Sequence, residues 1–276
     1  MVYPISTAER VIDELGILSL DDLEFLEEIA WARGALVRYE TLKGSEARLM
    51  AVGKPAIITI STEIVSKHRQ RFSIAHEIGH LEMHRQERSL SLCTKEKLNE
   101  WWSGITRKEI EYNSEQEANL FASALLLPEI FFAPLCDIEE PSLDYIGELA
   151  VKFNASLTST ALRYLFFSRE PLAVVWSQDN QIRWFQETEA FAEIRHDLGF
   201  FINVRSKLDS STRASYFYRS GSIPQGIKPV SASAWFTAGK YSKSATIKEH
   251  SIAMPTYNAS LSLLWVDDVI EEDQDY

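Results

Sequence analysis

The sequence predicts an α+β protein with two domains, in which a helical domain that contains a small β-sheet is followed by a mixed α/β domain. The length of 276 residues suffices for about two domains of average size. Apolar residues recur mostly at helical spacing up to about residue 170. After Pro171 the pattern changes to short β-like runs and turn residues. We therefore place the domains at 1–170 and 171–276.

The helices and strands of the first domain follow from the spacing of its apolar residues. Six segments have helical spacing, namely 7–15, 21–33, 68–85, 111–127, 142–152 and 156–167. Asp21 and Asp22 are suited to cap the second of these helices. Three short β-like runs lie between the second and third helices, namely 35–39, 48–52 and 56–60. The second domain begins with a predicted hairpin over 172–186, turned at Asp179-Asn180.

The composition limits the class of protein. Hydrophobic residues make up 45% of the chain, and the counts of Gly (11), Pro (9) and Cys (2) are low. Disordered, collagen-like and disulfide-stabilised classes are therefore excluded. No apolar run approaches the ~20 residues that cross a bilayer, and the N-terminus lacks the basic and apolar regions of a secretory signal. We expect a soluble, cytoplasmic protein in a reducing compartment, with no membrane partner.

The charge is unevenly distributed along the chain. The net charge of −12 argues against a protein that grips duplex DNA over its whole surface. Among the blocks 1–170, 171–250 and 251–276, only the second has more basic than acidic side chains. An anionic partner would therefore find a favourable field in that block, although charge runs of this size usually just solvate a face.

The chemistry of the chain is indicated by the stretch 71–84, which contains the pattern H-E-x-x-H as His76-Glu77-Ile78-Gly79-His80. Residues four apart lie on one face of a helix, about 6 Å apart along the axis. Both imidazoles can then reach one Zn²⁺ at ~2.0–2.1 Å. Glu77 is placed to take a proton from a water bound to that metal. The alternative, two unrelated surface histidines, fits poorly with the apolar residues around the motif.

A catalytic zinc ion needs a third protein ligand and one open position. His84 lies ~12 Å along a straight helix from His76 and is rotated by ~80°, so a structural or supporting role is expected for it. The better source is the helix 111–127, where Glu115 shares a face with small alanines that permit close packing. Glu117 points about 160° away from Glu115, so only one of the two can bind the metal. Glu115 is preferred and Glu117 is the alternative.

The stretches RFSIAHEIGHLEMH and EQEANLFASALLLP, with the β-like AIITI run before them, resemble the ImmA/IrrE metallopeptidases. The resemblance extends over about residues 5–170 and implies a zincin-like metallopeptidase domain. It implies that His76, His80 and Glu115 bind one zinc ion and that Glu77 is the catalytic base. It also implies cleavage of a partner helix-turn-helix repressor, which switches on stress, mobile-element or defence genes. Mn²⁺, Fe²⁺ or Co²⁺ could use the same ligand atoms.

Other side chains are candidates for supporting roles at this site. Arg163, Tyr112 and His84 could each hydrogen-bond the developing oxyanion, and a structural role is the alternative for each. Cys93 is predicted to lie in a loop near the site. Its thiolate could bind zinc at ~2.3 Å as an inhibitory fourth ligand, and the alternative is a small, partly buried hydrophobic residue.

Larger members of the ImmA/IrrE family carry a C-terminal GAF-like sensor domain, and residues 171–276 are expected to form such a mixed α/β domain. Basic and aromatic side chains alternate in it, and the candidate contacts for a ligand are Arg183, Trp184, Arg213, Tyr216, Tyr218 and Arg219. Core packing is the first interpretation for most of these aromatics. Single-stranded nucleic acid, which stacks on aromatic rings beside cations, and a small-molecule activator are the others.

The expected function is that of a zinc metallopeptidase controlled by its C-terminal domain. The alternative from another class is a non-catalytic, zinc-containing sensor or interaction protein that binds a repressor or nucleic acid. Glu77 favours the enzyme, because a purely structural zinc site has no use for that carboxylate.

Overall fold

The computed structural model describes residues 4–52, 54–84, 90–93, 113–239 and 244–266, and for 90–93 it is the backbone that is described. The chain divides into two compact units. Unit 1 comprises Met1–Leu135 with Leu149–Thr160, and unit 2 comprises Cys136–Glu148 with Ala161–Tyr276. The domain boundary near residue 170 stays a prediction.

Unit 1 begins with α1 (Pro4–Leu15), a 3₁₀ turn (Asp21–Leu23) and α2 (Leu26–Ala32). The single helix predicted for 21–33 is wrong, because Phe25 leaves helical geometry at φ −101° and ψ 64°. Asp22 does not cap α2. Its carboxylate accepts hydrogen bonds from the backbone N–H groups of Leu18 and Ser19 instead. Such local bonds are the reason that aspartate favours turns over helix interiors.

A four-stranded sheet of order β1-β3-β2-β4 forms one side of unit 1. Its strands are β1 (Ala35–Glu40), β2 (Ala47–Met50), β3 (Ala56–Ser61) and β4 (Leu90–Cys93). β1 and β3 are parallel, and the other two pairings are antiparallel. The three strands predicted between the second and third helices are confirmed. The loop predicted around Cys93 is wrong at this residue, because the backbone of Cys93 pairs with Ala47 in β2.

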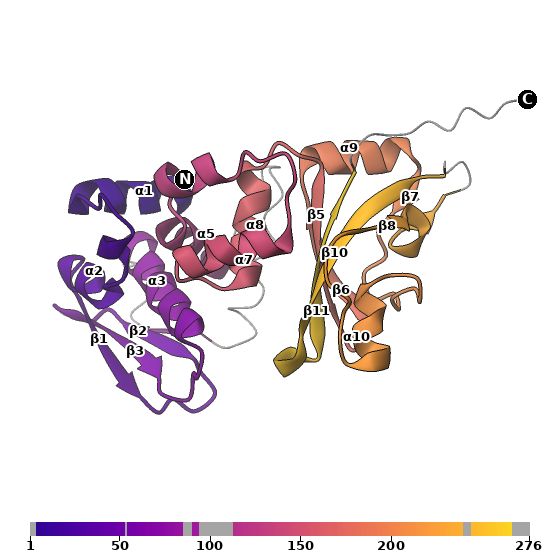
Figure 1. Cartoon of the computed structure of the whole chain (residues 1–276). Coiled ribbons are helices and arrows are strands. Elements are labelled where there is room, and N and C mark those ends of the chain that lie inside the picture. Colours follow the sequence, from indigo (N-terminus) through magenta and orange to yellow (C-terminus); the bar gives the residue numbers. More distant parts are fainter. Residues whose placement is uncertain (1–3, 53, 85–89, 94–112, 240–243, 267–276) are drawn as a thin grey trace, which may run out of the picture. The chain divides into compact units, whose positions relative to one another are not determined.

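α3 (Lys67–Met83) lies between this sheet and α5 (Ser114–Leu126), as Figure 1 shows. Side-chain caps fix where both helices begin. Ser66 accepts a hydrogen bond from the N–H of Arg69 at the start of α3. Asn113 and Gln116 form a reciprocal capping box at the start of α5. The helices predicted at 68–85 and 111–127 are therefore confirmed, with the second beginning three residues later.

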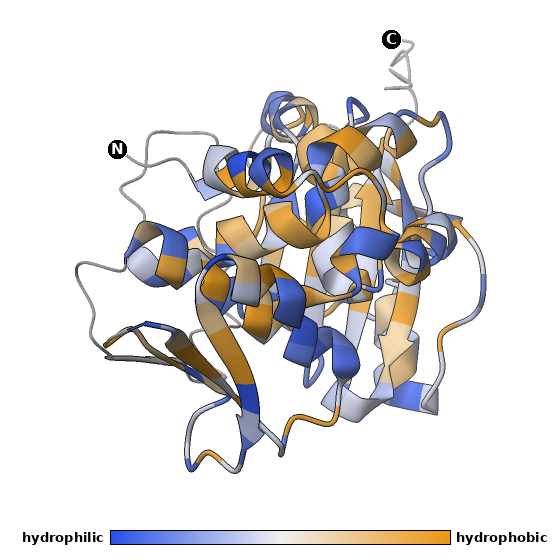
Figure 2. Ribbon diagram, turned by 90° about the vertical axis from the view of Figure 1, so that its left-hand side faces the viewer, coloured by the Kyte–Doolittle hydropathy of each residue, from blue (hydrophilic) through white to orange (hydrophobic). Residues whose placement is uncertain are grey.

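Close packing between α3 and α5 forms the core of unit 1. The middle of α3, from Phe72 to Leu81, is buried without interruption. At Gly79 an added Cβ atom would lie 3.0 Å from Cδ1 of Phe121 on α5, so glycine is what allows this approach. α1 also packs on both helices. Figure 2 shows hydrophobic and hydrophilic bands alternating along the surrounding helices, as expected of helices that bury one face.

The helices after α5 are short. They are α6 (Glu129–Phe132), a 3₁₀ turn (Ala133–Leu135), α7 (Leu143–Lys152) and α8 (Leu157–Phe167). α7 and α8 confirm the predicted pair to within one residue. Among the described helices, none is long and apolar enough to cross a membrane by itself. One bent pair, Ser114–Leu126 with Glu129–Leu135, meets the length and composition criteria when taken together.

Unit 2 contains a five-stranded antiparallel sheet of order β6-β5-β11-β10-β8. Its strands are β5 (Leu172–Gln178), β6 (Gln181–Glu187), β8 (Lys228–Ser231), β10 (Thr246–Met254) and β11 (Ala259–Trp265). The hairpin predicted at Asp179-Asn180 is confirmed. Both residues have positive φ, 53° and 60°, as a type I′ turn requires.

The other elements of unit 2 are α9 (Glu189–Asp197), α10 (Ala214–Ser220), the 3₁₀ turns Ala232–Ala234 and Pro255–Tyr257, and the strand pair β7 (Phe200–Phe201) with β9 (Thr237–Ala238). Phe191 of α9 packs with Phe236 and Trp235 in an apolar core that includes Val175 of the large sheet. The chain is therefore a mixed α/β protein.

A fully buried carboxylate organises one end of unit 2. Glu249 on β10 is 0% exposed. It accepts hydrogen bonds from the backbone N–H groups of Arg213 and Ala214, where α10 begins, at 3.0 and 2.9 Å. Trp235 Nε1 and the Ser251 hydroxyl also donate to it, at 3.0 and 2.7 Å. This single side chain therefore joins β10, α10 and the Ala232–Ala234 turn.

Replacing Glu249 by alanine is expected to lower the free energy of unfolding by at least about 3 kcal/mol, because several buried donors lose a charged acceptor. Urea unfolding followed by tryptophan fluorescence measures this. Glu193→Ala, on the exposed side of α9, is the control and should change the free energy by less than about 0.5 kcal/mol. Equal effects of the two substitutions would contradict the structural role of Glu249.

A second buried polar contact links β10 to α7. Nδ1 of His250 accepts a hydrogen bond of 3.1 Å from the N–H of Leu143, the first residue of α7. Burial lowers the pKa of His250, and Arg213 lowers it further, while nearby Asp144 opposes the shift. The neutral imidazole is therefore the form that the fold stabilises.

The stability of unit 2 is expected to fall in acid because of His250. Its folded pKa lies below the unfolded value of about 6.5, so the unfolded chain takes up the proton first. Stability is therefore complete above about pH 6.5 and declines as the pH falls through the folded pKa. Thermal unfolding at pH 8 and 5.5, with EDTA present, should show a smaller loss for His250→Gln than for wild type. The exposed His196→Gln control should match wild type, and equal losses in all three would refute the assignment.

Candidate metal centre

The two histidines of the H-E-x-x-H motif face each other one turn apart on α3. His76 and His80 are 0% and 1% exposed, and their Nε2 atoms are 3.0 Å apart. Ser66 sets where α3 starts, and every residue from Phe72 to Leu81 is buried. The motif therefore lies in the interior of unit 1.

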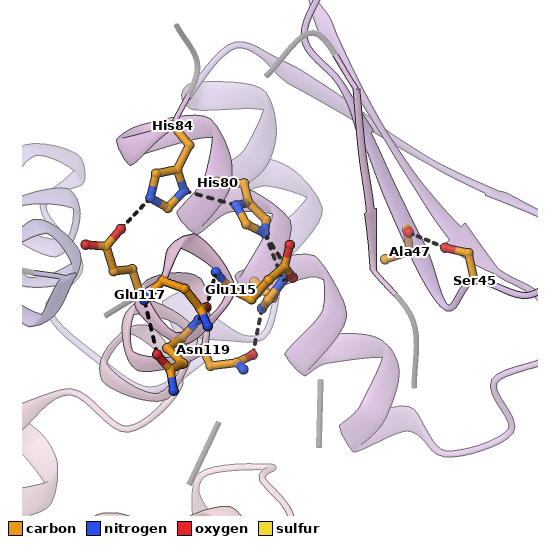
Figure 3. Close-up of polar contacts among 10 residues, drawn as sticks. Ser45, Ala47, His80, His84, Glu115, Glu117 and Asn119 are labelled. Atoms are coloured by element: carbon orange, nitrogen blue, oxygen red, sulfur yellow. Dashed lines mark hydrogen bonds and ion pairs between the residues drawn. The ribbon is translucent and has the colours of Figure 1, made fainter. Parts of the chain in front are cut away.

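α5 brings a carboxylate to the same point. Oε2 of Glu115 lies 3.5 Å from Nε2 of His76 and 3.6 Å from Nε2 of His80. The close-up in Figure 3 shows Glu115 reaching from α5 toward the ring of His80. Glu115 is in the first turn of α5, so the Asn113 cap that starts this helix also places the carboxylate.

These three atoms have the spacing of ligands around one tetrahedral ion. Metal–ligand bonds of ~2.0–2.1 Å put neighbouring ligands about 3.3–3.4 Å apart. The observed triangle of 3.0, 3.5 and 3.6 Å has a point about 2.0 Å from all three atoms. His76, His80 and Glu115 are thus a group that could hold a metal ion. Among the described residues three ligand atoms converge, which would leave a fourth position for water or substrate.

The outer nitrogen of His76 is held by a residue that the sequence analysis missed. Nδ1 of His76 lies 2.8 Å from Oδ1 of Asn119, which is buried one turn after Glu115 on α5. An amide oxygen accepts, so Nδ1 carries the proton and Nε2 is left with its lone pair. The i, i+4 spacing of Glu115 and Asn119 was the signal in the sequence.

The outer nitrogen of His80 is held by a different pair. Nδ1 of His80 lies 3.0 Å from Nδ1 of His84, and Nε2 of His84 lies 2.6 Å from Oε2 of Glu117. Figure 3 shows this connection running from Glu117 through His84 to His80. Glu117, the alternative third ligand in the sequence analysis, thus lies beside His84, and it is Glu115 that lies beside the motif histidines.

The charge states of the group suit a cation. Burial lowers the pKa of His80 to about 4, although contact with Glu115 opposes this shift. Burial raises the pKa of Glu115, but the contacts with His76 and His80 outweigh it and hold the pKa well below its usual range. At neutral pH the site therefore presents a neutral imidazole and a carboxylate, which are the forms that bind metals.

Glu77 is the buried carboxylate next to the first histidine. Its side chain is 0% exposed, and on α3 it projects about 100° around the axis from His76. Burying a carboxylate is costly unless positive charge or hydrogen-bond donors compensate it. A cation held by the neighbouring histidines would supply such compensation.

The structure does not bring the remaining candidates together with the three ligand atoms. Tyr112 and the side chain of Cys93 lie outside the described residues, so a role for Cys93 as an inhibitory ligand stays a prediction. Arg163 belongs to unit 2, where it is buried with its guanidinium 4.6 and 5.2 Å from the rings of Phe167 and Phe166. His84 contacts His80 from the outer side, as described above.

The basic and aromatic candidates of the C-terminal domain mostly have partners within unit 2. Trp184 is buried and stacks on Trp176 at 6.2 Å. Arg213 donates to the carbonyl oxygens of Pro224 and Gln225. The remaining contacts are those of Tyr218 with the Ser177 carbonyl, Arg219 with the Tyr216 ring and Ser210 carbonyl, and Arg183 with Asp179. Binding of nucleic acid or a small molecule stays a prediction.

Zinc is expected to stabilise the protein through this group of three ligands. Ligand binding to the folded state alone adds about 2.7 kcal/mol when free metal exceeds the Kd 100-fold. Thermal unfolding with zinc and then with excess EDTA measures the gain and its loss. Glu115→Gln should remove most of the gain, whereas the exposed Glu129→Gln should keep it. A gain that is the same in both variants would exclude Glu115 as a ligand.

Part of the chain is similar to a known family, and its fold is similar to that of a solved structure. The model of the IrrE N-terminal-like domain, a peptidase family, matches residues 28–164. No curated protein matches the sequence. Among solved structures, a Mycobacterium tuberculosis transcriptional regulator has a similar fold, with a TM-score of 0.59 and 18% identity over 95% of this chain and 75% of that one. Residues 28–164 therefore belong to the IrrE N-terminal-like family, as the sequence motifs predicted.

Proposed function

We propose that the protein is a zinc-dependent endopeptidase that cleaves a partner helix-turn-helix repressor under the control of its C-terminal domain. The observation that carries the proposal is the triangle of His76, His80 and Glu115, whose sides of 3.0–3.6 Å fit one tetrahedral zinc ion. Glu77 in the same helical turn supplies the acid–base group that hydrolysis needs. Membership of a peptidase family supports this chemistry.

Each residue of the site would have a separate role in peptide hydrolysis. His76, His80 and Glu115 would hold the zinc ion, which when bound polarises the scissile carbonyl and makes water more acidic. Glu77 would accept the proton of the attacking water and return it to the leaving amine. Asn119 would keep the His76 ring in the ligating tautomer.

The substrate and the control of the enzyme are the finer part of the proposal. A partner repressor is the substrate that the IrrE-like sequence implies, and the similar fold of a transcriptional regulator is compatible with it. Unit 2 would act as the GAF-like sensor, with its antiparallel sheet as the scaffold. Cleavage of the repressor would then switch on stress, mobile-element or defence genes.

Replacing Glu77 by glutamine is expected to keep zinc binding and to lower the rate of cleavage by at least about 100-fold, because general acid–base catalysis contributes this much. The assay incubates the zinc-loaded chain with a candidate helix-turn-helix protein, such as one found encoded beside its gene, and measures fragments by mass spectrometry. Glu82→Gln, on the same helix, is the control and should retain cleavage.

Three outcomes would contradict parts of the proposal. A wild-type chain that binds zinc and the repressor without ever cutting it would favour the non-catalytic sensor or interaction protein. Cleavage by Glu77→Gln at the wild-type rate would exclude Glu77 as the acid–base group. Broad digestion of unrelated unfolded proteins would favour a general peptidase over a repressor-specific one.

A further inference from the structure

A series of side-chain contacts leads from Glu117 on α5 through His84 to the outer nitrogen of His80. Oε2 of Glu117 contacts Nε2 of His84 at 2.6 Å, and Nδ1 of His84 contacts Nδ1 of His80 at 3.0 Å. His84 is 5% exposed and the side chain of Glu117 is 24% exposed. This series of contacts therefore starts near the surface and ends in the interior.

The direction of these hydrogen bonds follows from what each group can donate. A carboxylate only accepts hydrogen bonds, so Nε2 of His84 carries a proton and donates the hydrogen bond that Glu117 accepts. With one proton per ring, Nδ1 of His84 is then an acceptor, and Nδ1 of His80 must donate to it. His80 would consequently present the lone pair of Nε2 to a bound ion, at a point where this atom lies 3.0 Å from Nε2 of His76 and 3.6 Å from Oε2 of Glu115.

The opposite tautomer of His80, with the proton on Nε2, would prevent this ring from binding a metal ion. A proton on Nε2 of His80 would occupy the space between His80, His76 and Glu115, where an ion has to sit. His76 is held against this by the Asn119 amide, whereas His80 depends on His84 and Glu117. The two motif histidines therefore have independent supports from two positions of α5.

We propose that His84 and Glu117 are positioning residues that hold His80 in its metal-binding tautomer and thereby set the affinity of the centre for zinc. The inference rests on the proposed zinc centre and deepens it. The alternative is a purely structural role, because the backbone N–H of His84 also donates a hydrogen bond to the carbonyl oxygen of His80 at the end of α3. That backbone bond survives any substitution of the side chain.

The test compares the full-length chain with His84→Phe and Glu117→Ala, which remove the acceptor for His80 and the acceptor for His84. Competition with a chromophoric chelator measures zinc affinity. Imidazole ¹⁵N NMR of the metal-free protein reports which nitrogen of His80 carries the proton. We expect Nδ1–H in wild type, a mixture of tautomers in both variants, and zinc affinity lower by about 10–100-fold.

Two further variants separate positioning from packing and charge. Glu117→Gln keeps an oxygen that can accept from His84 and should restore most of the affinity. Glu82→Gln removes a carboxylate from the same end of α3, where Glu82 pairs with Arg33 at 2.7 Å, and should leave both the tautomer and the affinity unchanged. A loss of affinity in Glu82→Gln equal to that in Glu117→Ala would refute the proposal.

The outcomes distinguish this inference from the proposed function. If wild type binds no zinc, the proposed function fails. Suppose instead that wild type binds zinc, and that His84→Phe and Glu117→Ala bind it equally well with His80 still protonated on Nδ1. The inference about His84 and Glu117 then fails, whereas the proposed zinc centre is retained. A drop in thermal stability without a change in tautomer or affinity would likewise assign His84 and Glu117 a purely structural role.

Discussion

The close contact between α3 and α5 is the constraint on which the rest of unit 1 depends. α3 carries both histidines and α5 carries Glu115, Glu117 and Asn119, so neither helix contains a complete site. Gly79 lets the ring of Phe121 approach α3 to within van der Waals distance. A Cβ atom at this position would lie 3.0–3.2 Å from the Phe121 side chain, so Phe121 would have to shift by a few tenths of an ångström. A triangle with sides of 3.0–3.6 Å tolerates little displacement.

The same contact gives each motif histidine a separate hydrogen-bond partner. The Asn119 amide holds one ring, and His84 with Glu117 holds the other. Three potential ligand atoms are thereby held close together in the interior. The fold of unit 1 thus orders these side chains before a metal binds, so much of their conformational entropy is lost during helix packing and not during metal binding.

Unit 2 uses buried polar groups for a different purpose. Glu249 and His250, neighbours on β10, direct their side chains to α10 and α7 respectively. Each fixes the beginning of a helix against the same strand. Most basic and aromatic candidates for a nucleic-acid surface likewise contact partners within unit 2.

The sequence by itself determined that the H-E-x-x-H motif lies on one helix, that Glu115 lies on another, and that a hairpin turns at Asp179-Asn180, because these depend on helical periodicity and on local turn chemistry. It did not determine the break at Phe25, the pairing of Cys93 in a fourth strand, or the partners of Asn119, His84 and Glu117. The pairing of Cys93 and these side-chain partners depend on which faces of distant segments meet, whereas the break at Phe25 follows a turn with local hydrogen bonds to Asp22. Spacing along one helix fixes the direction of a side chain, whereas only the packing of α3 on α5 decided that Glu115 lies beside the histidines and Glu117 beside His84.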